Sequence, residues 1–133
     1  LNVEKGYFVD IKTTKSDIDS MVWVQDEASG RNIQVRWFEA WGYVLQMAAY
    51  KKILEDQYGK EFTPIIYAVT KEATPDTRAI VFQTQEKLGY ELTELSMLIQ
   101  RLDKVKRGEE EAKPCGHCEY CKTKALTQRV EVI

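Results

Sequence analysis

Cysteine is absent from the first 114 residues of this 133-residue chain, and all three cysteines lie within seven residues near the end. Disulfides therefore cannot hold the main part of the chain together, and it must fold around a buried core. An odd, closely spaced set of cysteines is typical of metal ligands in a reducing compartment.

Long apolar runs and an excess of basic charge are also missing. No run approaches the roughly 20 residues that span a bilayer, and the N-terminus lacks the basic-then-apolar pattern of a signal peptide. The net charge is −2 and the sequence pI is about 5.5. Charge alone thus gives no argument for nucleic acid, and any such argument must come from a local site.

The sequence has enough apolar residues, 44%, for one core. Residues 6–14 are β-rich, and Leu1 and Val3 alternate like the end of a partner strand, which predicts a hairpin. Residues 15–32 are expected to form a long functional or mobile loop. Because the chain lacks a starting Met and begins almost in a strand, we expect native sequence before Leu1.

A long helix is predicted from Ile33 to Tyr58, ending at Gly59 and buried between layers because apolar residues surround it. Residues 62–69 are expected to form a strand covered on both faces, and residues 78–83 a further strand. A second leucine-rich helix should run to Gly108. The order β-β-α-β-β-α predicts an α/β layered domain with a mixed sheet.

Asp10 and Lys12 are the first candidate site residues. Residues two apart in a strand share a face, so a carboxylate and an ammonium should lie side by side. The carboxylate suits Mg²⁺ or Mn²⁺, and the lysine can position a water or offset charge on phosphate. For the tripeptide alone, a chance Asp–Lys pair on a polar strand face is the favoured interpretation.

Gln46 and Tyr50 lie four residues apart on the predicted helix, and Tyr43 and Glu39 extend the same stripe. Buried polar groups need partners, since each unpaired one costs roughly 1–3 kcal/mol. The stripe either faces an active-site cleft or belongs to an ordinary amphipathic core.

Cys115, Cys118 and Cys121 form two overlapping CxxC steps, with His117 between them. Zinc and cubane clusters take four ligands, so the fourth ligand is either His117 or a cysteine in preceding sequence. Reduced, unliganded cysteines are the alternative.

Together these motifs resemble a known family. The segment Val9 to Thr14 resembles the D/E-x-K-T strand of RecB-type PD-(D/E)XK nucleases, and Gln46 to Tyr50 resembles their Q-x-x-x-Y helix motif. The cysteines resemble the C-terminal cluster of exonuclease VIII-like proteins of phage and prophage. The resemblance implies an α/β restriction-endonuclease-like core, a mixed β-sheet flanked by helices. Residues 1–108 would be the C-terminal part of the nuclease domain, and residues 109–133 a charged linker with a Cys-cluster tail.

The resemblance further implies a metal-dependent DNA exonuclease that hydrolyses linear DNA with Mg²⁺ or Mn²⁺. It would act in phage or prophage recombination or repair in bacterial cytoplasm, without a membrane, and a single-strand annealing protein is an expected partner. The implied roles are metal binding by Asp10 and the Ile11 carbonyl, water activation by Lys12, and positioning by Gln46 and Tyr50. Lys71 and Tyr43 would contact DNA. Cys115, Cys118 and Cys121 would hold an iron–sulfur cluster or Zn²⁺.

One departure from the family pattern concerns its first metal-binding Asp, which lies on the strand before D-x-K. Leu1, Asn2 and Val3 are not acidic, so we expect that Asp upstream and expect the 133 residues alone to be nearly inactive. The rival interpretation is a non-catalytic nuclease-fold module that binds DNA or protein and is stabilised by a zinc or iron–sulfur Cys cluster. A small zinc-binding interaction protein is a third.

Overall fold

The computed structural model describes residues 1–15, 17–26, 29–114 and 118–125. It forms two compact units, Leu1–Ser96 and Met97–Ile133. Unit 1 holds every strand that the structure describes and the site proposed below, so each unit is considered by itself.

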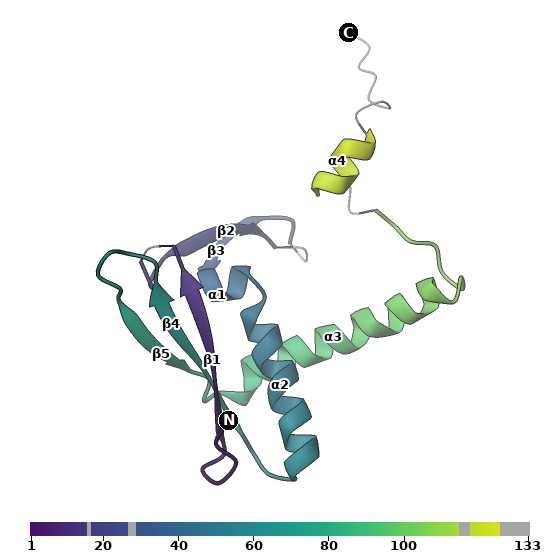
Figure 1. Cartoon of the computed structure of the whole chain (residues 1–133). Coiled ribbons are helices and arrows are strands. Elements are labelled where there is room, and N and C mark those ends of the chain that lie inside the picture. The colour runs from purple at the N-terminus through teal and green to yellow at the C-terminus, as the bar shows by residue number, and fades with distance from the viewer. Residues whose placement is uncertain (16, 27–28, 115–117, 126–133) are drawn as a thin grey trace. The chain divides into compact units, whose positions relative to one another are not determined.

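The sheet of unit 1 is three-stranded and mixed. β1 (Tyr7–Thr14) pairs parallel with β4 (Thr63–Thr70), and β4 pairs antiparallel with β5 (Thr77–Val81), giving the order β1-β4-β5 (Figure 1). The predicted strands at 6–14, 62–69 and 78–83 are confirmed to within two residues. The predicted mixed sheet is confirmed as well.

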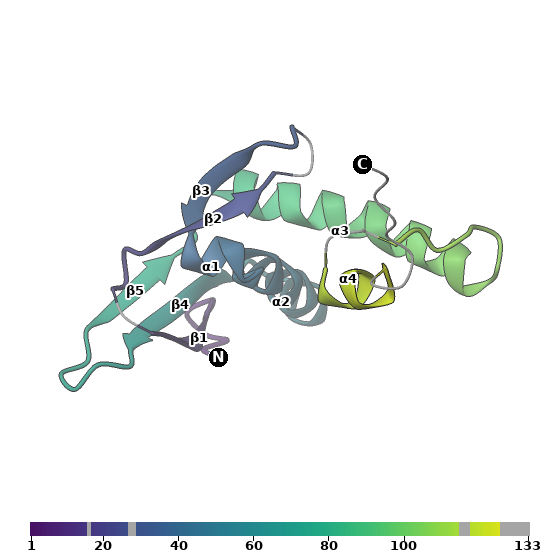
Figure 2. The same ribbon diagram turned by 90° about the horizontal axis from the view of Figure 1, so that it is seen from above.

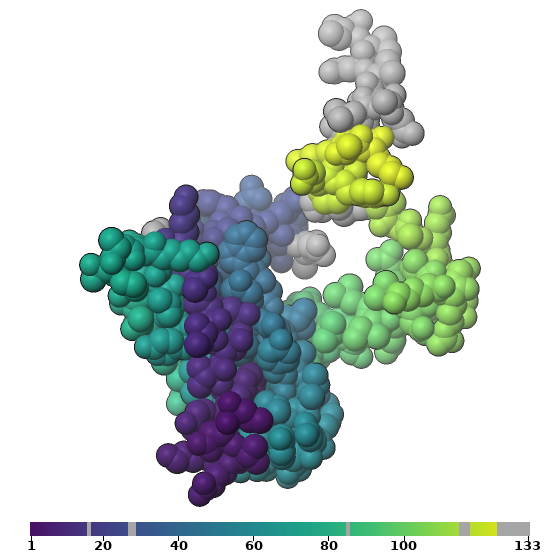
Figure 3. Space-filling model, in the orientation of Figure 1, coloured from purple at the N-terminus to yellow at the C-terminus, as the bar shows by residue number. Residues whose placement is uncertain are grey.

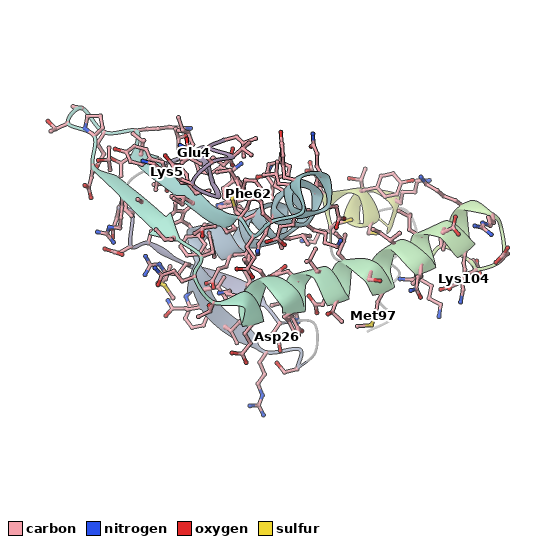
Figure 4. All side chains as sticks on the ribbon, turned by 90° about the horizontal axis from the view of Figure 1, so that it is seen from below. Glu4, Lys5, Asp26, Phe62, Met97 and Lys104 are labelled. Carbon is pink, nitrogen blue, oxygen red and sulfur yellow. The ribbon has the colours of Figure 1, made fainter. Side chains whose placement is uncertain are left out.

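The core lies between this sheet and α2 (Tyr43–Tyr58). Alternate residues of a strand share a face, so Phe8, Ile66 and Ala68 turn towards α2. They belong to one buried cluster with Val44, Met47 and Ala48. Phe62, labelled in Figure 4, lies at the junction of α2 and β4 and is also buried.

The opposite face of the sheet is open among the described residues. Val9 and Tyr67 are exposed there, and Ile11 is 69% exposed. The expectation that residues 62–69 are covered on both faces is therefore wrong. The apolar run reflects one buried row, Pro64, Ile66 and Ala68, interleaved with a more accessible one.

The expected loop at 15–32 and the expected start of a helix at Ile33 are also wrong. β2 (Met21–Gln25) and β3 (Asn32–Arg36) pair as an antiparallel hairpin that packs on α1 (Trp37–Ala40) (Figure 2). Val22 pairs with Val35 and Val24 with Ile33. These cross-strand β-branched pairs stabilise the hairpin over a helix.

The remaining part of the expected long helix is divided in two by a glycine. Gly42 has φ 68°, a left-handed conformation that glycine adopts without steric cost, and its N–H donates to the Glu39 carbonyl at 2.9 Å. α2 ends at Tyr58, and Gly59 caps it as expected. α2 is buried on one side only, because Tyr50 and Ile53 are exposed.

The N-terminus makes a tight turn into β1. The Asn2 N–H donates to the Tyr7 carbonyl at 2.8 Å, a single antiparallel bridge that supports the expected hairpin. Gly6 has φ 67°, and a Cβ there would lie 2.9 Å from the Glu61 carbonyl oxygen. Figure 3 shows this purple segment beside the blue-to-teal α2 on one face of unit 1.

α3 (Gln85–Lys106) begins in unit 1, where Leu88 is buried and Lys87 forms an ion pair with Glu39. The rest of α3, which carries Met97 and Lys104 in Figure 4, belongs to unit 2 with α4 (Glu119–Ala125). Within the described chain, no helix has the length and apolar character needed to cross a membrane.

Candidate functional site

β1 carries a carboxylate and an ammonium on its α2-facing side. Asp10 and Lys12 follow buried Phe8 in alternation, with side chains 29% and 16% exposed. Asp10 Oδ2 lies 2.8 Å from Lys12 Nζ. The pair is thus partly buried and still accessible to solvent.

α2 contributes a polar amide opposite this pair. Lys12 Nζ donates to Gln46 Oε1 at 2.6 Å, and Gln46 Nε2 donates to the Tyr50 hydroxyl at 2.8 Å. Because an ammonium can only donate, the amide oxygen of Gln46 must be the atom that faces Lys12. The structure therefore brings together Asp10, Lys12, Gln46 and Tyr50, which come from two motifs 34 residues apart.

Tyr43 completes the cluster through its ring. Lys12 Nζ lies 4.2 Å from the centroid of that ring, within the range of a cation–π contact. The ring itself packs edge-on against Trp37, with centroids 6.0 Å apart. Trp37 is buried, and its indole N–H donates to the Ile18 carbonyl at 2.9 Å. The lysine is therefore held by a carboxylate, an amide and an aromatic face.

One oxygen of this cluster lacks a well-aligned hydrogen bond. Asp10 Oδ2 is buried, and despite its closeness to Lys12 it receives no hydrogen bond of good geometry from the residues that the structure describes. Lys12 balances the charge of Asp10, but this oxygen still lacks a well-aligned donor, and a bound cation can coordinate it. Asp10 therefore fits the role of a metal ligand.

The Ile11 carbonyl offers a second oxygen. The Thr14 carbonyl accepts a hydrogen bond from the Lys71 N–H on the β4 side of β1. The Tyr7 carbonyl accepts one from the Asn2 N–H on the opposite side. Since successive residues of a strand alternate in the direction of their carbonyls, Ile11 shares the direction of Tyr7 and faces the open edge of β1. Among the described residues, no three His, Cys, Asp or Glu side chains form a metal-binding group.

Two expected members lie outside the cluster. Lys71 is exposed after β4, and among the described contacts only its backbone N–H, which donates to the Thr14 carbonyl at 2.9 Å, approaches β1. Glu39 belongs to α1 and accepts from the Arg36 N–H at 2.7 Å. The expected extension of the α2 stripe to Glu39 is wrong because Gly42 breaks the helical register between them.

The Cys-rich segment is described only in part. Cys115 and His117 lie outside the described residues. Cys118 precedes α4, Cys121 lies within it, and the Cys121 N–H donates to Cys118 Sγ at 3.5 Å. Convergence of the three thiolates on one metal stays a prediction.

A groove beside the cluster contains residues that sequence reasoning missed. It has a volume of about 390 Å³, and its lining includes Thr14, Lys15, Ser20, Val22, Trp41 and Tyr43. The sequence signal was an aromatic residue, Trp41, directly before a helix-breaking glycine. In the structure Trp41 caps the C-terminus of α1 and is 69% exposed instead of buried in a helix face.

The loop next to this groove is fixed by charge. Asp19 Oδ1 accepts from Arg36 at 3.0 Å and from Arg78 of β5 at 2.6 Å. The hydrogen bond from Arg78, aided by its positive charge and that of Arg36, holds the pKa of Asp19 below its usual value, and Asp19 in turn raises the pKa of Arg78. The loop is thereby tied to β3 and to β5.

Comparisons with known proteins agree with the motifs and the fold. Residues 1–124 match the family model described as "PDDEXK-like domain of unknown function (DUF3799)". A solved structure described as "Putative exonuclease" from Eubacterium rectale is 31% identical, with a TM-score of 0.71. The match covers 96% of this chain and 44% of the other, so the chain spans less than half the length of that relative. No curated protein matches the chain.

Proposed function

The chain belongs to the PDDEXK-like domain family, and on this premise we propose that it forms part of a metal-dependent exonuclease that hydrolyses the phosphodiester bonds of linear DNA. The observation that carries the proposal is the buried Asp10 Oδ2, which lies 2.8 Å from Lys12 Nζ but has no well-aligned hydrogen bond among the described residues. The likeness to a protein described as an exonuclease supports the exonuclease assignment. A role in phage or prophage recombination or repair follows from the resemblance of the motifs.

Asp10 Oδ2 and the Ile11 carbonyl would hold Mg²⁺ or Mn²⁺. Mg²⁺ is usually bound by one or two carboxylates together with water and substrate phosphate, so a full cage of protein ligands is unnecessary. The fit rests on this Asp10 oxygen, which lacks a well-aligned donor, and on the position of Ile11 at the open strand edge. When bound, the metal would supply Lewis-acid polarisation and lower the pKa of a coordinated water.

Lys12 would orient the attacking water and offset the negative charge that develops on the phosphate. Its ammonium is preorganised by Asp10, Gln46 and Tyr43, so it need not move to meet that charge. Gln46 and Tyr50 act as positioning residues through Lys12. The Tyr43 ring holds the Lys12 ammonium through a cation–π contact. Lys71 would contact the phosphate backbone from the end of β4.

The direct test uses the native protein and end-labelled linear duplex DNA. Hydrolysis should appear with Mg²⁺ or Mn²⁺, disappear with EDTA, and leave covalently closed circular DNA intact. Cleavage of closed circles at the same rate would contradict the exonuclease assignment. DNA binding without hydrolysis in either metal would instead favour the non-catalytic module.

Gln46 offers a test of the positioning role. Gln46→Leu removes the acceptor of Lys12, and since a hydrogen bond to a charged group contributes about 1.5–3 kcal/mol, kcat should fall at least about tenfold with KM nearly unchanged. Gln46→Glu keeps an acceptor oxygen and should retain more activity.

Gln57→Leu is the matched control, because Gln57 is exposed on the same helix. Thermal melts of all three variants establish that they are folded. An unchanged kcat in folded Gln46→Leu would remove the assigned role.

A further inference from the structure

The side chains that line the groove beside Tyr43 include two chemical kinds. Trp41 and Tyr43 are aromatic, while Thr14, Ser20 and Lys15 supply hydroxyls and a positive charge. Its volume of about 390 Å³ falls within the range of small-ligand sites. Aromatic faces combined with positive charge are the chemistry by which proteins hold single-stranded nucleic acid.

The groove adjoins the Asp10–Lys12 cluster. Tyr43 belongs to both, because its ring lies 4.2 Å from Lys12 Nζ and also lines the groove. Thr14 and Lys12 are on the same side of β1, since they are two residues apart. A chain of nucleotides whose phosphate meets Lys12 would therefore pass its neighbouring nucleotide into this groove.

Trp41 is presented for contact from a rigid corner. Its side chain is 69% exposed, yet its backbone N–H donates to the Trp37 carbonyl at 3.1 Å and the Gly42 N–H to Glu39. Trp37, one helical turn before it, is buried, and its indole N–H donates to the Ile18 carbonyl. The backbone held in this way keeps the Trp41 side chain at the groove, where a base can stack on it.

We propose that this groove binds the nucleotide adjacent to the scissile phosphate, with its base stacked on Trp41 and its phosphate near Lys15. The proposal rests on the proposed function and deepens it. A base inside a duplex is stacked on both faces, so Trp41 can stack only on an unpaired base or on the terminal base of a duplex end. The groove therefore selects single strands and strand ends.

The chain carries a matched control for Trp41. Trp23 is 65% exposed, but it neighbours Val22 in β2, and Val22 lines the groove. Successive strand residues point to opposite faces, so Trp23 points away from the groove. The two tryptophans thus have similar exposure and differ in whether they face the site.

The experiment measures binding of a fluorescent single-stranded oligonucleotide to the native protein by anisotropy, with EDTA present so that the strand is not cut. Because Trp41→Ala removes the ring on which the base stacks, its Kd should be about tenfold or more higher than that of the wild type. Trp23→Ala and Trp41→Phe should stay within about twofold of wild type. Lys15→Gln should reduce the slope of log K against log salt by about 0.7, the value for one lost phosphate contact on a single strand.

Equal binding by folded Trp41→Ala and wild type overturns the groove assignment, as does an equal loss in Trp23→Ala. The same variants assayed for cleavage separate this inference from the proposed function. Hydrolysis by the wild type without any dependence on Trp41 overturns the groove alone. Trp41-dependent binding in a protein that cuts no DNA supports the groove and contradicts the nuclease.

Discussion

Asp10→Asn in the native protein is expected to lower the rate of metal-dependent DNA hydrolysis by about 10³-fold or more. The substitution replaces a charged ligand oxygen by a neutral amide, and metal assistance contributes several kcal/mol to such a reaction. Asp10 Oδ2 also has no well-aligned hydrogen bond among the described residues, so it is available to a metal. The measurement is the single-turnover cleavage rate, together with Mn²⁺ affinity by calorimetry.

Asp56→Asn is the control for this change, because Asp56 is exposed at the far end of α2 and pairs with Lys52. It should leave both the rate and the Mn²⁺ affinity unchanged. A folded Asp10→Asn variant that cleaves DNA at the wild-type rate would show that the metal is held elsewhere.

Lys12→Ala is expected to reduce hydrolysis by roughly 10²- to 10³-fold, the usual cost of removing one preorganised donor from developing charge. It leaves Asp10 in place, so Mn²⁺ binding should persist while the rate falls. This separation of metal affinity from rate distinguishes the role of the lysine from that of the aspartate. Both quantities are measured on the same preparation.

Lys52→Ala removes an exposed lysine from α2 and serves as the matched control. Lys12→Ala also removes a half-buried ion pair and a hydrogen bond to Gln46. A melting temperature is therefore measured with each rate. Full activity in Lys12→Ala would remove the lysine from the mechanism.

The parts of the fold that could be predicted are those with local signals. β1 and β5 have strand composition, and Gly59 marks the end of α2. The β2–β3 hairpin could not be predicted because each of its strands is short and its stability comes from pairing between the two strands. Its signals were the alternation of Ile33, Gln34 and Val35 and the turn at Gly30, whose φ is 67°.

The candidate site was predictable in pieces. The spacing of Asp10 and Lys12 gives a shared strand face, and the spacing of Gln46 and Tyr50 gives a shared helix face. Their meeting depends on how α2 packs against β1, which no local pattern specifies. For the same reason, the contact of Lys12 with the Tyr43 ring and the groove at Trp41 emerged only from the structure.

The most direct test of the Asp10–Lys12 centre is anomalous diffraction from crystals of the native protein with Mn²⁺ and an uncleavable DNA strand. We expect a manganese peak at about 2.1 Å from an Asp10 carboxylate oxygen, next to the Ile11 carbonyl, with a DNA phosphate in hydrogen-bonding reach of Lys12 Nζ. A fully occupied manganese site with bound DNA that leaves Asp10 without a metal contact would contradict the account.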